Sequence, residues 1–366
     1  MTDTEPHPPE SQAALATVRS VRGTVVRVTL TVVALWYFTR VVRRIDWSQV
    51  GAALSDLPVT QILALLAVVA LRQTLNASPL ALFVPGLGLR RALANDLSAN
   101  LVSTIAPPPG DLVLRIAMFR SWGVPVSQGI GGLTLNTLTY FVARFGAPLL
   151  GLGLALAAGQ SQPSFVYTAL VSGAISLSIV IGLAISTRGE AAAARVAAAV
   201  ATPVQRFAPK VDPEQWSRTA SEFVVNVADR VRSRALPAGA TQVALVLTET
   251  LLLLLSLRFA GVPASAADAA SVVIALLIAY PLTALPFAGL GVLDAAVLAL
   301  LSLNGGPWEM AAVAGMVIFR TCGVLVPLAL GGVTMLWWRR TAATALADMV
   351  PPVPASEVPD QRDDHQ

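Results

Sequence analysis

Nine charged side chains interrupt segments of this sequence that are otherwise apolar. They are Arg72, Asp96, Asp111, Arg115, Arg144, Glu249, Asp268, Asp294 and Arg320. At the centre of a bilayer each charge costs about 2.5–3.5 kcal/mol, so each must meet a partner or a water-filled cavity. Arginine is also suited to two-pronged recognition of phosphate. The charges therefore predict either buried salt bridges or a polar cavity that binds a charged headgroup.

Three of these charges follow clusters of helix-breaking residues. In "PPPGDLVLR" the residues Pro107, Pro108, Pro109 and Gly110 precede Asp111 and Arg115, and in "LPFAGLGVLD" the residues Pro286, Gly289 and Gly291 precede Asp294. Proline and glycine do not continue a helix. One interpretation is a simple turn. The other is an unwound segment that lines a cavity, followed by helix N-terminal amides able to meet a phosphate.

The two clusters belong to a longer internal repeat. An offset of 179 residues relates Pro107 to Pro286 and Arg115 to Asp294. Similar offsets relate other intraspan charges: 177 residues separate Arg72 from Glu249, and 176 separate Arg144 from Arg320. Such regular spacing favours duplication. At two of these positions the paired residues have opposite signs, so we expect Arg72 to pair with Glu249 and Arg115 with Asp294 near a pseudo-two-fold axis. Arg144 and Arg320 could contact phosphate or pair with Asp96, Asp111 or Asp268.

The composition indicates a protein that lies in a membrane. Of 366 residues, 55% are hydrophobic and 13% charged, and the mean hydropathy is +0.68, whereas about a quarter of residues are charged in soluble domains. Apolar runs near the length of a bilayer span, about 20 residues, predict eight spans. They lie at about 24–42, 60–83, 91–107, 127–157, 164–186, 238–259, 267–285 and 309–337. Two shorter runs, 110–121 and 289–303, predict re-entrant helices, giving an all-α polytopic fold.

Basic residues predict the topology. Arginines concentrate in 188–236 and follow the last span at Arg339 and Arg340, which places these segments and both termini in the cytoplasm. The spans carrying Arg144 and Arg320 then run in opposite directions, as in inverted-repeat transporters. We expect disordered tails at 1–20 and 346–366 and a transmembrane domain over 21–345. That domain divides into repeat 1 (58–187), a cytoplasmic amphipathic segment (188–236) forming a surface helix pair, and repeat 2 (237–338).

Several function classes are excluded. His7 and His365 lie in the polar tails and Cys322 is the single cysteine, so no metal site, disulfide or imidazole catalysis is expected. "GLGVLD" follows a helical run, not a strand, and is not a nucleotide loop. The net charge of +4 is spread over loops, which favours anionic lipids over nucleic acid as contacts. We expect no enzyme activity, no catalytic residues and no cofactor.

The chain resembles the lysylphosphatidylglycerol synthase transmembrane region family, whose members are also called flippase-like domain proteins. The resemblance covers roughly residues 20–340 and is carried by "TIAPPPGDLVLRIAMFRSWGV", "ALPFAGLGVLDAAVLALLSLNGG", "YFVARF" and "MVIFR". Many members have glycine at the position of Ala288 and glutamate at that of Asp294, and in this chain Arg115 lies one residue further from Gly110 than is usual. In the name-giving enzymes a soluble aminoacyl transferase domain follows, whereas this chain ends about 30 residues after its last span.

The resemblance implies movement of a lipid between leaflets without synthase activity. We expect Arg115, Asp294, Arg144 and Arg320 to contact the polar head of a phospholipid or lipid-linked substrate. An alternative is an accessory subunit that holds a lipid for a partner glycosyltransferase or synthase. An intramembrane enzyme using Asp111, Asp294 or Glu249 is a third reading, for which no nucleophile–base set can be named. Lys210 is the only lysine, which suggests a GC-rich bacterial genome and hence the bacterial cytoplasmic membrane.

Overall fold

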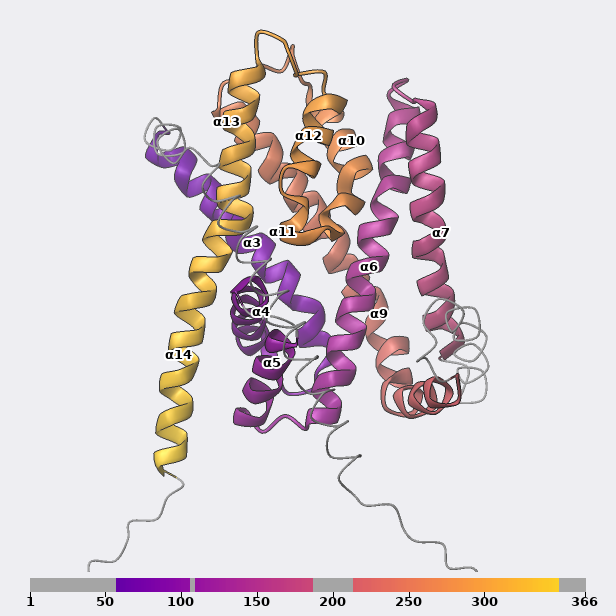
Figure 1. Cartoon of the computed structure of the whole chain (residues 1–366), viewed down its shortest axis with the longest axis vertical. Helices are drawn as coiled ribbons and strands as arrows, with labels where there is room; N and C mark the ends of the chain where they lie inside the picture. The colour runs from indigo at the N-terminus through magenta and orange to yellow at the C-terminus, as the bar shows by residue number, and fades with distance from the viewer. Residues whose placement is uncertain (1–56, 106–108, 187–212, 349–366) are drawn as a thin grey trace, which may run out of the picture.

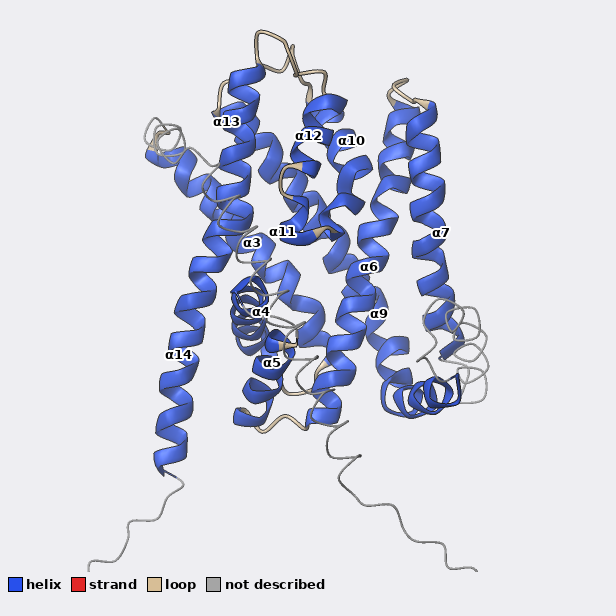
Figure 2. Ribbon diagram, viewed as in Figure 1, coloured by secondary structure: helices blue, strands red, loops and turns tan. Residues whose placement is uncertain are grey.

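The computed structural model describes residues 57–105, 109–186 and 213–348, and all regular structure in them is helical, as the composition predicts (Figure 2). The first half contains α3 (Val59–Phe83), α4 (Gly88–Ile105), α5 (Gly110–Ser121), α6 (Val126–Ala157) and α7 (Pro163–Ser186). The second half contains α9 (Pro213–Phe259), α10 (Ala269–Ala279), the 3₁₀ helix η1 (Tyr280–Ala284), α11 (Pro286–Gly289), α12 (Val292–Leu300), α13 (Glu309–Arg320), the π-helix η2 (Thr321–Leu325) and α14 (Val326–Asp348).

Some predicted features lie outside the described residues. These are the span at 24–42, the N-terminal tail, Pro107 and Pro108, the segment 187–212 and residues 349–366. The remainder of the predicted cytoplasmic segment is part of α9, which continues from Pro213 through Pro237 to Phe259 without interruption. The described part of the segment, from Pro213, thus joins the following predicted span in one helix, and the predicted surface helix pair stays a prediction.

Five helical segments of the described residues are long and apolar enough to cross a membrane. They are 59–83, 126–157, 163–185, 228–259 and 309–342. The predicted count of eight is not confirmed. Helix α4 carries Arg90, Arg91 and Asp96, which lower its hydropathy, and the apolar segment 269–284 is shorter than a span.

The short helices occupy opposite halves of the molecule (Figure 1). Helices α4 and α5 lie in the lower half of this view, whereas α10, α11 and α12 lie in the upper half, and α11 lies near mid-height. The long helix α6 and the continuous α13–η2–α14 rod pass along both halves. Elements from both halves of the chain thus approach the middle of the molecule.

The π-helix η2 lies directly before a proline of the same rod. Pro327 has no backbone N–H, so it cannot donate to the carbonyl of Gly323 four residues earlier. The preceding residue, Val326, donates its N–H to the carbonyl of Thr321, five residues back, which is the π-helical pattern. The rod is therefore widened by one residue directly after Arg320, and π-bulges of this kind occur frequently at functional sites.

Apolar side chains hold the helices together. The largest buried cluster joins α3, α9, α10, α12 and α13, and Leu252, Leu253 and Leu257 of α9 are fully buried within it. On the outer surface, by contrast, large apolar residues of α7 such as Tyr167, Leu170 and Leu177 are exposed. An apolar exterior around a packed interior is what a lipid environment requires.

Two neighbouring glycines of α14 allow a matched test of helix packing. A Cβ atom on Gly331 would lie 2.4 Å from the carbonyl oxygen of Leu97 in α4, whereas one on Gly332 would meet nothing nearer than 4.0 Å. We expect Gly331→Ala to destabilise the protein by about 1–3 kcal/mol through overpacking. Gly332→Ala should stabilise it slightly, because alanine favours a helix.

Thermal unfolding of the two purified variants in detergent measures this difference. Equal melting temperatures for Gly331→Ala and Gly332→Ala would show that α4 and α14 do not approach each other this closely.

Candidate functional site

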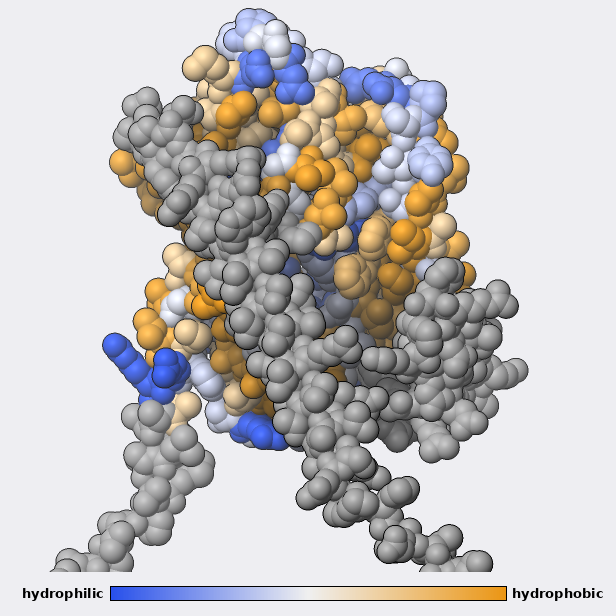
Figure 3. Space-filling view, in the orientation of Figure 1, coloured by the Kyte–Doolittle hydropathy of each residue, from blue (hydrophilic) through white to orange (hydrophobic). Residues whose placement is uncertain are grey.

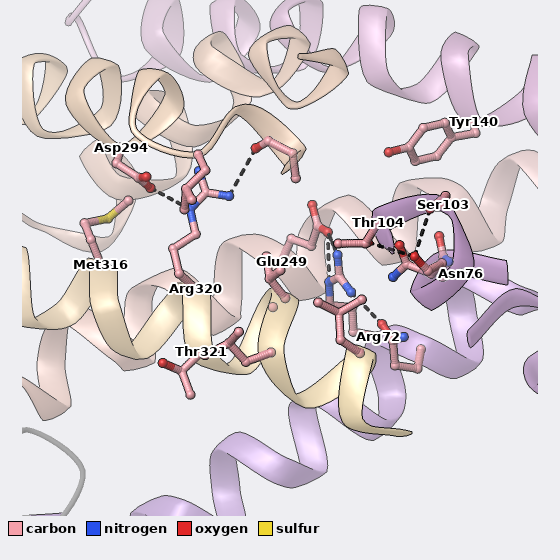
Figure 4. Close-up of a pocket in the computed structure, with 18 of the residues that line it drawn as sticks. Arg72, Asn76, Ser103, Thr104, Tyr140, Glu249, Asp294, Met316, Arg320 and Thr321 are labelled. Carbon is pink, nitrogen blue, oxygen red and sulfur yellow. Dashed lines mark hydrogen bonds and ion pairs between the residues drawn. The ribbon is translucent and has the colours of Figure 1, made fainter. Parts of the chain in front are cut away.

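A cavity of about 820 Å³ lies among α3, α4, α5, α6, α9, the α11–α12 segment, α13 and η2. The space-filling view shows hydrophilic residues in the hollow between apolar surfaces (Figure 3). Seven of the charged residues singled out in the sequence contribute to its wall: Arg72, Asp96, Asp111, Arg115, Glu249, Asp294 and Arg320. The helices thus bring residues from both halves of the chain to one polar chamber (Figure 4).

Arg72 and Glu249 form an ion pair between the two halves. Nε of Arg72 donates to Oε1 of Glu249 at 2.8 Å, and Nη2 donates to the same oxygen. The two side chains are only 20% and 12% exposed, and α3 packs along α9 to bring them together. This pair was predicted from the opposite signs at equivalent repeat positions.

Arg115 forms its ion pair with a residue from the same half of the chain. Its Nη2 lies 3.3 Å from Oδ1 of Asp96, and its Nη1 donates to Oδ1 of Asn95 at 2.9 Å. The other oxygen of Asp96 accepts a hydrogen bond of 2.6 Å from Nδ2 of Asn76. These contacts hold the short helix α5 against α4 and α3.

Asp294 and Arg320 form the corresponding pair in the second half, with Nε of Arg320 donating to Oδ1 of Asp294 at 2.7 Å. Both residues also bind the interrupted backbone. Asp294 accepts from the N–H of Gly291 at 2.7 Å, and Arg320 donates to the carbonyls of Ala288 and Gly289 at 3.1 and 3.4 Å. The ion pair therefore fixes the segment between α11 and α12.

That segment has an unusual backbone. Ala288, Gly289 and Gly291 have φ values of 54°, 68° and 83°, a region that costs residues other than glycine about 1–2 kcal/mol. A Cβ on Gly289 would also lie 2.4 Å from the carbonyl oxygen of Leu282. The corresponding break in the first half places Pro109 directly before α5, which begins at Gly110.

The predicted ion pair between Arg115 and Asp294 is not formed. Each residue pairs instead with a neighbour from its own half, Arg115 with Asp96 and Asp294 with Arg320. The physical reason is that the helix next to each residue in the chain already supplies an opposite charge within reach. Helix α4 supplies Asp96 to Arg115, and helix α13 supplies Arg320 to Asp294. Long-range pairing across the repeat is therefore confined, among the described ion pairs, to Arg72 and Glu249.

Arg144 lies outside the cavity wall and is 7% exposed. Its guanidinium carbon is 4.0 Å from the centre of the Tyr140 ring, a cation–π geometry. Its Nε has no hydrogen-bond partner. Asp268, one of its predicted partners, instead caps α10 by accepting from the N–H and hydroxyl of Ser271 at 3.0 and 2.8 Å. These bonds hold the pKa of the Asp268 carboxyl below its usual value.

The sequence interpretation did not select the neutral polar residues of the cavity wall. They include Asn76, Asn136, Tyr140 and Gln242. Helical spacing could have identified them, because residues four apart share a helix face. Asn76 lies four residues after Arg72, and Tyr140 lies midway between Asn136 and Arg144.

Residues 24–331 match the family model described as "Lysylphosphatidylglycerol synthase TM region". The matched range includes both helix interruptions and every charged residue of the cavity wall. Comparison with curated proteins gave no match, and comparison with solved structures gave none either.

The geometry predicts that Arg72 and Glu249 are energetically coupled. Replacing either residue alone with glutamine leaves the other charge buried without its partner, which costs about 3 kcal/mol. The double variant, Arg72→Gln with Glu249→Gln, should therefore lower the melting temperature by less than the sum of the two single variants.

The matching cycle on Arg115 and Asp294 serves as the control. These two residues have separate partners, so their effects should add. Additive effects at Arg72 and Glu249, or coupling between Arg115 and Asp294, would contradict the observed pairing.

Proposed function

Because the chain belongs to the lysylphosphatidylglycerol synthase transmembrane region family, we propose that it binds the polar headgroup of a membrane lipid in its central cavity and moves that headgroup between leaflets. The lipid tails remain in the surrounding bilayer. The chain acts without enzymatic chemistry of its own, and its partners are membrane lipids.

The single observation that carries the proposal is a large polar cavity inside an otherwise apolar helical bundle. Its volume, about 820 Å³, falls within the range of small-molecule sites, about 300–1,000 Å³. Keeping several charges at this depth is costly. The charges have a function that offsets this cost if they line a hydrated path through the bilayer, because a polar headgroup cannot enter the hydrocarbon.

The helix interruptions give the proposal a mechanism. In our interpretation residues 58–187 and 237–338 are inverted repeats, and α4–α5 and the α10–α12 segment are the broken elements that approach the cavity from opposite halves. Secondary transporters with this organisation bind substrate between the repeats and expose the site to each side in turn. Ion pairs such as Asp294 with Arg320 would keep each broken element intact during such a movement.

We also propose the setting of this activity. The chain lies in a bacterial cytoplasmic membrane with both termini in the cytoplasm, which follows from the arginine-rich segments at 188–236 and after 338. The alternative role, an accessory subunit for a membrane glycosyltransferase or lipid synthase, requires the same cavity but no exchange between leaflets.

Gly323 provides a direct test, because it lines the cavity and a Cβ there would meet no atom within 4 Å. A phenylalanine at this position should project into the cavity and obstruct part of it without disturbing the surrounding helices. We expect wild-type protein in liposomes to accelerate leaflet exchange of at least one labelled lipid, and Gly323→Phe to reduce that rate at least tenfold. The panel contains phosphatidylglycerol, phosphatidylethanolamine, an aminoacylated lipid and a polyprenyl-linked lipid.

Gly182 of α7 is the matched control. It has equally free space around its Cβ position but does not line the cavity, so Gly182→Phe should retain the wild-type rate. The proposal of transport fails if no lipid is exchanged, or if Gly323→Phe exchanges lipid as fast as wild type. Binding of a lipid without exchange would favour the accessory role.

A further inference from the structure

We propose that the cavity recognises an uncharged, hydroxyl-bearing headgroup, such as a glycosyl group, through carboxamide side chains on α6 and α9. The inference rests on the proposed function, because it specifies which class of lipid headgroup enters the cavity. It follows from the polar groups that remain available once the contacts within the protein are accounted for.

The arginines of the cavity wall are already paired. Arg72, Arg115 and Arg320 each contact a carboxylate of the protein. The wall contains five acidic residues, Asp96, Asp111, Glu249, Asp294 and Glu309, against these three basic ones. A phosphate would therefore enter a site with an excess of negative charge, and it would have to displace a carboxylate to reach an arginine. Binding of an anionic headgroup is therefore electrostatically disfavoured in this cavity.

The acidic residues are also largely occupied. Asp96, Glu249 and Asp294 are in ion pairs, and Glu309 accepts from the N–H of Gly305 at 3.0 Å. Among the described residues, Asp111 alone of this acidic group has neither an ion pair nor a hydrogen bond through its carboxylate. An ammonium headgroup would thus find one available carboxylate, whereas hydroxyl groups can also use the neutral polar side chains of the wall.

Neutral carboxamides supply the unsatisfied hydrogen-bonding groups. Oε1 of Gln242 and Oδ1 of Asn136 are buried and have no hydrogen-bond partner, although both side chains contribute to the cavity wall. Gln242 is only 1% exposed. A buried polar atom without a partner is costly. A carboxamide both donates and accepts hydrogen bonds, as a hydroxyl group does, so neighbouring hydroxyls of a sugar or polyol suit this site.

The surrounding wall fits the same ligand. Tyr140 lies one turn after Asn136 on α6, and it contributes to the cavity wall together with Ser103 and Thr104 (Figure 4). Phe141 adds a second aromatic ring beside it, with the ring centroids 6.0 Å apart. Hydroxyl and amide groups next to aromatic rings allow hydrogen bonding to the polar edge of a sugar and apolar contact with its C–H face.

Lipid binding to the purified full-length protein tests this inference. Native mass spectrometry would compare monoglucosyl diacylglycerol with diacylglycerol of the same chains, and with phosphatidylglycerol and lysyl-phosphatidylglycerol. We expect the glucosyl lipid to bind at least tenfold more tightly than diacylglycerol. Gln242→Leu and Asn136→Leu should each reduce that preference about tenfold, as expected for loss of one buried hydrogen bond.

Gln61→Leu is the control, because Oε1 of Gln61 is also buried without a partner but lies outside the cavity wall. It should leave the preference unchanged, and melting temperatures would verify that all variants are folded. Equal binding of glucosyl lipid and diacylglycerol would overturn the inference. So would a preference for lysyl-phosphatidylglycerol that is abolished by Asp111→Asn.

These outcomes are separable from those of the proposed function. If the wild-type protein exchanges lipids in liposomes but shows no preference for the glucosyl headgroup, the headgroup assignment is wrong and lipid transport stands. If it neither binds nor exchanges any lipid, both proposals fail.

Discussion

Charges inside an apolar helical bundle must be neutralised by the protein itself, and this constraint determines how the elements are arranged. The short helix α5 is held by Arg115 against Asp96 of α4. The interrupted segment before α12 is held by Asp294 and Arg320. Neither element has the length to be stabilised as an ordinary span. The ion pairs therefore do more than offset the burial of charge, because they fix the broken helices on which the cavity depends.

Backbone irregularities act together with these pairs. The π-helix η2 begins directly after Arg320, and its residues Thr321 and Gly323 line the cavity wall. Ala288 adopts a positive φ where glycine would be unstrained, and Arg320 binds its carbonyl oxygen. The strain is thus located where an arginine compensates for it, as expected for strained segments at functional sites.

The sequence predicts the long apolar helices and the charged residues of the cavity well, because hydropathy and isolated charges are local signals. The pairing of Arg72 with Glu249 also followed from repeat spacing. The partner of Arg115 did not, because it depends on the angle between α4 and α5, which no periodicity encodes. Gln242 was missed for a different reason: one neutral amide barely changes the hydropathy of its helix, and its importance appears only when its lack of a partner is visible.

The distribution of ion pairs bears on how a transport cycle could operate. The pairs of Arg115 with Asp96 and of Asp294 with Arg320 lie within single halves, so relative movement of the halves would leave them unchanged. The pair of Arg72 with Glu249 joins α3 to α9 across the two halves. Relative movement of the halves would therefore have to lengthen this ion pair, which leaves two buried charges without their partners and is costly.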